Sequence, residues 1–153
     1  MLFATTPVAA GDLADGMAAF NAGDYPKAFR LYKRSAEQGN ERAQVNHGMM
    51  YQSGEGGPKD YAKAVHWFTE AAKQGDAKGQ LMLGLMYGGG TGIPKNYVRA
   101  YAWLRLVAEQ GSAKAKKATS ENFAKRMTPA QIAKGQKLSR ELRKKYVVPF
   151  QKE

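Results

Sequence analysis

Apolar side chains recur along the chain at the three-and-four spacing of amphipathic helices. One predicted helix, from about residue 61 to residue 74, carries a single apolar face made of Tyr61, Ala64, Val65, Trp67, Phe68 and Ala71. Gly75 follows this helix, and a glycine can take the left-handed conformation that ends a helix. A further helix is predicted from about residue 77 to residue 87. The pattern therefore predicts a chain built from pairs of helices.

The predicted helix pairs repeat with a period of 36 residues. The positions that recur three times are Tyr25, Tyr61 and Tyr97; Ala28, Ala64 and Ala100; and Gly39, Gly75 and Gly111. A period of this length indicates a solenoid, in which stacked units bury a continuous core. Gly48 and Gly84 recur inside predicted helices, where a glycine costs about 1 kcal/mol relative to alanine. They predict a close crossing of the paired helices.

The loops and the C-terminal segment define further element boundaries. Asp60 and Asn96 are placed to cap the second helix of their units. Residues 113–126 are predicted to form the first helix of a fourth unit, and Thr128-Pro129 to begin a last helix. Because the terminal repeat of a solenoid must present one face to water, this last helix is predicted to be a cap.

The predicted fold is all-α, a right-handed α-solenoid of helix-turn-helix repeats with a C-terminal capping helix. A single domain is expected over residues 12–146, with units at about 12–40, 41–76, 77–112 and 113–146 and a tail over 147–153. Residues 1–11 are expected to be the tail of a truncated export signal or a disordered terminus. Val8-Ala9-Ala10 fits the small-residue pattern of a cleavage site, which favours a periplasmic or secreted protein over a cytoplasmic one.

Two units resemble the Sel-one-like repeat family, a relative of the tetratricopeptide repeats. The residues that carry the resemblance are Ala43, Gly48, Tyr51, Gly54, Asp60-Tyr61, Ala64, Trp67 and Ala71-Ala72 in unit two, and Leu83-Gly84, Tyr87, Gly90, Tyr97, Ala100, Trp103 and Ala108 in unit three. His47 departs from the pattern, because the family has leucine there. The resemblance covers about residues 12–146. It implies a scaffold or adaptor that binds other proteins, often exported in bacteria, without catalysis of its own.

The tetratricopeptide repeats, in which the first helix of each unit lines a concave groove, indicate which residues of this chain face such a groove. The expected groove residues are Arg42, Val45, Met49, Gln52, Lys78, Leu81, Leu85, Gly88, Lys114, Lys117 and Glu121. Arg42, Lys78 and Lys114 are 36 residues apart, so stacking is expected to place them in a ladder beside an apolar strip. Such a ladder suits an acidic peptide or protein, although three solvated surface cations would give the same pattern.

The net charge of +11 is concentrated near the C-terminus. Residues 1–40, 41–76, 77–112 and 113–153 carry 0, −1, +3 and +9. A basic C-terminal patch is expected at Lys134, Lys137, Arg140, Arg143, Lys144 and Lys145. This imbalance indicates an anionic partner or, equally, a solvated helix surface.

Nucleic-acid or anionic envelope-polymer binding through the basic C-terminal helices is the alternative function. Nucleic acid is disfavoured because no aromatic residues interleave with those cations. The repeat aromatics Tyr61, Trp67, Tyr97 and Trp103 are expected to be used in packing. The preferred function is therefore a non-catalytic adaptor for an acidic peptide or protein.

Other candidate chemistry is sparse. The chain has no cysteine and two histidines, and no apolar run long enough to span a membrane. His47 is expected to be a buried imidazole with satisfied hydrogen bonds, and His66 to face solvent. The methionines at helical spacing are more typical of core or groove than of a copper site. No catalytic residue, metal, cofactor or small-molecule substrate is expected.

Overall fold

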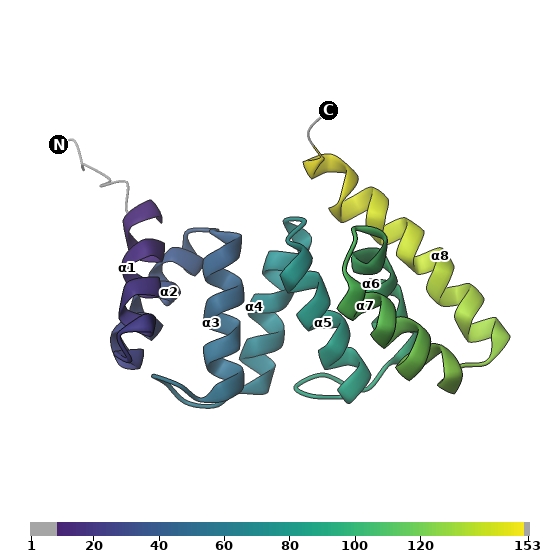
Figure 1. Cartoon of the computed structure of the whole chain (residues 1–153), viewed down its shortest axis with the longest axis horizontal. Helices are drawn as coiled ribbons and strands as arrows, with labels where there is room; N and C mark the ends of the chain where they lie inside the picture. The colour runs from purple at the N-terminus through teal and green to yellow at the C-terminus, as the bar shows by residue number, and fades with distance from the viewer. Residues whose placement is uncertain (1–8, 152–153) are drawn as a thin grey trace.

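The computed structural model describes residues 9–151, with only the backbone described at residues 9, 10, 120 and 121. These residues form helices and no strand. The α-helices are α1 (Ala9–Asn21), α2 (Tyr25–Glu37), α3 (Glu41–Ser53), α4 (Tyr61–Lys73), α5 (Ala77–Gly89), α6 (Tyr97–Glu109), α7 (Ala113–Lys117) and α8 (Pro129–Tyr146). They form successive hairpins side by side, with α8 crossing the C-terminal end (Figure 1). The predicted α-solenoid with a capping helix is confirmed.

The export-signal prediction concerns mainly residues 1–8, which lie outside the described residues. Residues 9–11 form the first turn of α1.

The helix boundaries follow local capping chemistry. Asp60 and Asn96 accept hydrogen bonds from the backbone N–H groups of Lys63 and Arg99, at 3.0 and 2.9 Å, and so begin α4 and α6 as predicted. Thr128 begins α8 with a capping box completed by the side chain of the third helical residue.

Close helix crossings build the core. A Cβ atom added at Gly48 would lie 2.8 Å from the Phe68 ring, and one added at Gly84 would lie 2.9 Å from Leu104. Since real Cβ atoms do not approach so closely, only glycine permits these crossings, as predicted. Each second helix also packs on the first helix of the next unit, so the core runs continuously from α2 to α6. Its largest fully buried side chains include Phe68, Met50, Leu83, Leu104 and Leu106.

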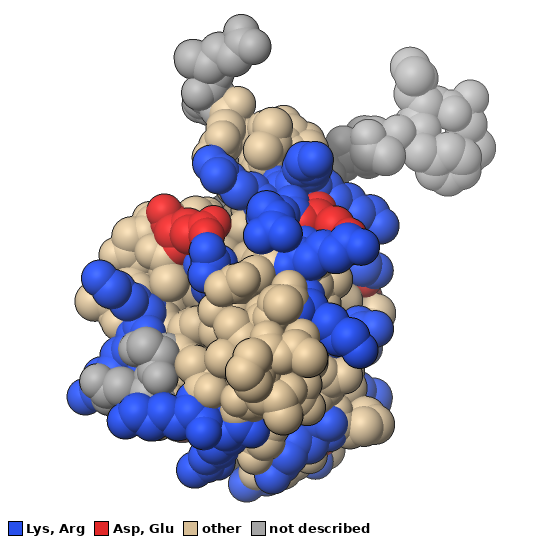
Figure 2. Space-filling model, turned by 90° about the vertical axis from the view of Figure 1, so that its right-hand side faces the viewer, with Lys and Arg blue, Asp and Glu red and all other residues tan. Residues whose placement is uncertain are grey.

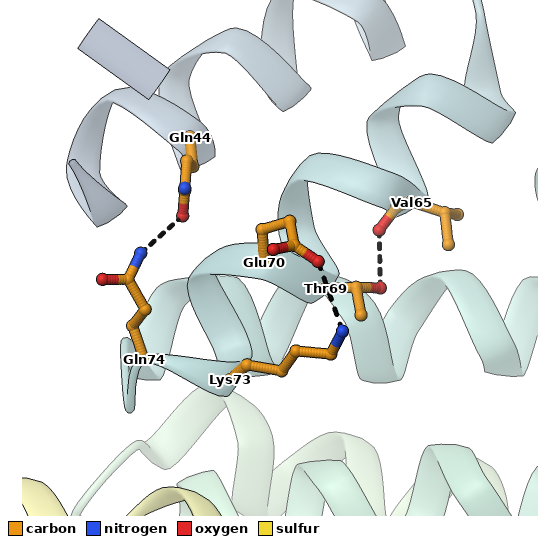
Figure 3. Close-up of polar contacts among 6 residues, drawn as sticks. All are labelled: Gln44, Val65, Thr69, Glu70, Lys73 and Gln74. Atoms are coloured by element: carbon orange, nitrogen blue, oxygen red, sulfur yellow. Dashed lines mark hydrogen bonds and ion pairs between the residues drawn. The ribbon is translucent and has the colours of Figure 1, made fainter. Parts of the chain in front are cut away.

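Buried glutamine side chains connect consecutive units. Gln74 donates from Nε2 to Oε1 of Gln44 at 2.9 Å (Figure 3). Gln74 also donates to the carbonyl of Gly39 at 2.8 Å, and Gln44 donates to the carbonyl of Ala36. The next unit repeats this arrangement, because Gln110 donates to Gln80 at 3.0 Å and Gln80 donates to the carbonyl of Ala72 at 3.2 Å. These bonds satisfy polar groups at the seams between units.

The C-terminal segment departs from a regular helix pair. Residues 113–126 run through α7, the π-helical segment η1 (Ala118–Phe123) and the 3-10 turn η2 (Ala124–Arg126). Helices α7 and α8 both pack on α6. Gly135 lies against the Tyr101 ring, and Tyr146 stacks on Trp103 with ring centroids 5.9 Å apart. The last helix therefore covers α6 and closes the stack.

The prediction that His47 has satisfied hydrogen bonds is wrong. Its side chain is fully buried, and neither ring nitrogen has a hydrogen-bond partner. The imidazole lies among the rings of Phe29, Tyr51 and Trp67, with centroids 4.6, 4.7 and 5.5 Å away. Burial, aided by the charges of Lys33 and Lys63, lowers the pKa of His47 to about 4. His66 is exposed, as predicted.

The glutamine contacts make a testable contribution to stability. The substitution Gln80→Ala leaves the carbonyl of Ala72 and the amide of Gln110 without this buried partner. We expect a loss of about 1–3 kcal/mol in the free energy of unfolding, measured by urea denaturation. Gln38→Ala is the control, because Gln38 is exposed at the repeat position of Gln74 and Gln110 and, among the described residues, its side chain bonds to no buried glutamine. Equal losses in the two variants would show that the seam bonds do not contribute.

His47 predicts a dependence of stability on pH. Below about pH 6.5 the unfolded chain binds a proton on His47 that the folded chain does not bind until about pH 4. The free energy of unfolding should therefore decrease as the pH falls from about 6.5 to about 4. At pH 4, protonation of His47 in the unfolded chain should account for a loss of about 3 kcal/mol. Urea denaturation from pH 7.5 to pH 4 should show a smaller decline in His47→Leu than in the wild type. His66→Gln should follow the wild type, and identical curves for all three would contradict the prediction.

Candidate functional site

A cavity of about 580 Å³ opens between α1, α2, α3 and the start of α5. Its apolar lining comes from Met17, Phe20, Tyr32, Val45, Met49 and Met50. Met49 is 37% exposed, although the neighbouring Met50 is buried in the core. The helix α3 thus presents a thioether to solvent at the centre of the cavity. We call this cavity the groove.

The two ends of the groove differ in charge. Arg42 and Lys78 lie at the starts of α3 and α5, and neither forms an ion pair with another described residue. Asp76 lines the same end, but its Oδ1 accepts the backbone N–H of Gly79 at 2.7 Å as the cap of α5. Burial and the charge of Glu41 raise the pKa of Asp76, while backbone hydrogen bonds from Gly79 and Lys78 and the charge of Lys78 oppose that shift. At the other end, Glu55 accepts a hydrogen bond from Ser53, with Oγ and Oε2 3.1 Å apart.

The buried Tyr32 and the partly exposed Asn46 connect α2 and α3 at the groove wall. Burial raises the pKa of the Tyr32 hydroxyl, and a hydrogen bond with Asn46 and the charge of Arg42 oppose that shift. The hydroxyl therefore stays protonated near neutral pH, so this wall of the groove carries no negative charge.

The structure brings together five of the eleven predicted groove residues. Those that line the groove are Arg42, Val45, Met49, Gln52 and Lys78. Of the three cations in the predicted ladder, Arg42 and Lys78 line the groove and Lys114 does not.

The remaining predicted groove residues lie elsewhere. Leu81 and Leu85 are half-buried against the cluster of Ala100, Leu104 and Phe123. Gly88 was assigned to the groove wrongly, because the Phe123 ring covers it. On α7, Lys114 and Lys117 are exposed outside the groove. The side chain of Glu121 lies outside the described residues.

Sequence reasoning missed the contribution of α1. The hairpin of the first unit is four residues shorter than the others, so equivalent positions on α1 and α3 are 32 rather than 36 residues apart. With this correction, Met17 and Phe20 correspond to Met49 and Gln52, and both line the groove. Asn46 was also missed, although it lies between Arg42 and Met49 on the same helix face.

The predicted basic C-terminal patch lies on α8. All six of its cations, Lys134, Lys137, Arg140, Arg143, Lys144 and Lys145, are exposed. Glu141 is the single acidic residue of this helix. Viewed from the C-terminal end of the stack, lysine and arginine side chains surround an uncharged centre (Figure 2).

Neither a metal-binding group of side chains nor a membrane helix is present in the described part of the chain. No group of three His, Asp or Glu side chains between residues 9 and 151 could hold a metal ion. No helix in the same range is both long and apolar enough to cross a membrane.

A family model described as the Sel1 repeat matches residues 18–40, 41–76 and 77–112. The chain belongs to the Sel1 repeat family. The matched segments contain α2 to α6 and most of the groove, whereas α7 and α8 lie beyond them. Sel1 repeat proteins are in general protein–protein interaction scaffolds and typically non-enzymatic.

Solved Sel1 structures share the fold. The protein c5321 of uropathogenic Escherichia coli, described as a protective antigen, is 28% identical with a TM-score of 0.84, over 90% of this chain and 30% of its own. A Sel1 repeat protein from Oxalobacter formigenes is 33% identical with a TM-score of 0.67, over 75% of this chain and 89% of its own. Helicobacter pylori cysteine rich protein B is 27% identical with a TM-score of 0.55, over 59% and 68%.

This chain therefore spans less than a third of the length of the E. coli Sel1 protein that it resembles. No curated protein matches it.

Proposed function

We propose that this Sel1 protein is a non-catalytic scaffold that binds a short peptide segment with acidic and apolar side chains in the groove. The observation that carries the proposal is the pairing, in one cavity, of an apolar lining with two cations that form no ion pair with a described carboxylate. Arg42 and Lys78 can each donate to a ligand carboxylate, and a charge-assisted hydrogen bond is about twice as strong as a neutral one.

The dimensions of the groove suit a peptide of about five residues. The groove follows α3 from Arg42 to Ser53, which spans about 16 Å at the helical rise of 1.5 Å per residue. An extended chain covers this distance with about five residues at roughly 3.3 Å each.

The lining also explains how different apolar side chains could be accommodated. Met17 and Met49 have flexible, polarisable thioethers, which adapt to ligands of different shape. Asn21, Asn46 and Gln52 add amide groups that can bond to the backbone of an extended peptide. Affinity would then come from the apolar lining, and selectivity for acidic segments from the cationic end.

We also propose an exported location, periplasmic or secreted. Two observations support it: the small-residue pattern Val8-Ala9-Ala10 and the similarity to a Sel1 protein described as a protective antigen.

An array of six-residue peptides tests the groove. Peptides that combine Asp or Glu with Leu, Met or Phe should bind, and the same peptides with Lys in place of the acids should not. The double substitution Arg42→Ala with Lys78→Ala should weaken binding by about tenfold, the effect of roughly 1.4 kcal/mol, in fluorescence anisotropy titrations. Met49→Asp should weaken it as well, because it places a carboxylate in the apolar lining.

The matched control is Lys134→Ala with Lys137→Ala, which removes the same charge from α8. This control should bind like the wild type. Binding that does not depend on the peptide's charge, or equal losses in the groove and control variants, would contradict the proposal.

A further inference from the structure

The edge of the solenoid at which α4 and α6 begin carries cations seated on tyrosine rings. In unit two, Lys59 lies over Tyr61 at 5.1 Å from Nζ to the ring centroid, and Lys63 lies over Tyr51 at 5.5 Å. Unit three repeats both contacts 36 residues later. There Lys95 lies over Tyr97 and Arg99 over Tyr87, each at 5.7 Å. We call the four cations Lys59, Lys63, Lys95 and Arg99 the loop rim.

These contacts order the cations without neutralising them. A carboxylate partner would cancel the charge, whereas a ring face attracts the cation and leaves its charge and most of its N–H donors available. The ion pairs among the described residues are Arg34–Asp12, Lys73–Glu70 and Arg105–Glu109, and none includes a loop-rim residue. The loop rim is therefore a row of four cations, none of which forms an ion pair with a described carboxylate.

Few carboxylates oppose this row. Asp60 lies at the rim, but its Oδ1 accepts the backbone N–H of Lys63 as a helix cap. The equivalent residue in unit three is Asn96, which carries no charge. Glu55 is directed to the groove and bonded to Ser53.

The rim of one unit is packed directly on the next. Gly92 has a φ of +70°, and a Cβ atom there would collide with the backbone carbonyl of Tyr61, so the loop of unit three rests on the start of α4. Arg126, which follows α6 in the chain, lies beside this row. It donates a hydrogen bond to Tyr97, and this bond and the charge of Lys95 both lower the pKa of Tyr97.

The Tyr61 ring is part of the exposed surface of the loop rim. We expected this residue to be used in packing, but it is 37% exposed. Its backbone supports the next loop, and its ring supports Lys59. The residue thus contributes a partly open aromatic surface to the rim.

We propose that the loop rim is a second binding site, separate from the groove, for an acidic polysaccharide lying across units two and three. Carboxylate or sulfate groups on the polymer would accept hydrogen bonds from the rim cations. The exposed part of Tyr61 would contact a sugar ring.

The spacing of the charges favours a polysaccharide over nucleic acid. Helices α4 and α6 both pack on α5. Their first turns are therefore separated by at least one helix diameter, about 10 Å. Duplex DNA presents a charge about every 1.7 Å along its axis, so it would offer about six phosphates per rim position. Single strands bind by stacking successive bases on several open aromatic faces, whereas Tyr61 is the only exposed ring among the four tyrosines of the rim. A polymer with charges on individual sugars suits the spacing better.

Titration with size-fractionated alginate oligosaccharides tests the proposal, with the intact chain immobilised for biolayer interferometry. Binding should occur, weaken between 0.05 and about 0.15 M salt as screening increases, and be absent with uncharged dextran. The variant Lys59→Gln, Lys63→Gln, Lys95→Gln and Arg99→Gln should bind at least about tenfold more weakly. Tyr61→Leu retains every charge and should bind about threefold more weakly, because Lys59 loses its ring.

The control variant removes four charges from α8 through Lys134→Gln, Lys137→Gln, Arg143→Gln and Lys144→Gln. It should bind alginate within about twofold of the wild type, and both variants should keep the wild-type helical circular dichroism. Equal losses in the two variants would overturn the proposal, as would the absence of alginate binding. Tighter binding of oligo(dT) or duplex DNA than of alginate at about 0.15 M salt would also overturn it.

Discussion

The structure depends on the seam between one unit and the next. A single helix pair leaves an apolar face uncovered, and it becomes buried only when the first helix of another unit packs on it. The seams are also where polar groups must be satisfied. Gln44 and Gln80 extend across them to the carbonyls of the preceding helix, and each accepts a bond from the glutamine that ends its own unit. Packing and hydrogen bonding therefore require the same 36-residue register.

This seam also determines where surfaces are available. The first helices of neighbouring units form the groove, where Met49 and Arg42 remain accessible on the helix that buries Met50 and His47. The loops that join the helices of a unit collect at one edge and rest on the preceding unit. Their cations are consequently aligned as the loop rim. One repeat register thus produces two surfaces with different chemistry.

The stack ends where this register stops. At the repeat position of Gln44 and Gln80 the fourth unit has Lys116, and the following residues continue as a π-helical segment instead of a regular helix. The α8 helix covers α6 instead, with Gly135 against Tyr101 and Tyr146 stacked on Trp103. Because α8 turns its cations to solvent, the excess positive charge near the C-terminus lies largely on the closing helix.

The helices, their caps and their period could be predicted from the amino-acid sequence, because these features depend on residues that are close together in the chain. Asp60 caps α4, and Gly48 permits the crossing of α3 and α4, as local rules predict. Arg42, Met49 and Lys78 could also be assigned to the groove from the period. The period did not reveal Met17 or Phe20, because the shorter first hairpin shifts α1 by four residues.

Contacts between residues of different helices became known only from the folded arrangement. The aromatic surroundings of His47 come from three helices, and the seating of Lys59 and Lys63 on tyrosine rings depends on how each loop folds back. The same holds for Gly88, which the period assigned to the groove and Phe123 covers. Local preferences specify a helix and its faces. What each face touches depends on the packing of distant segments, which a repeat pattern does not encode.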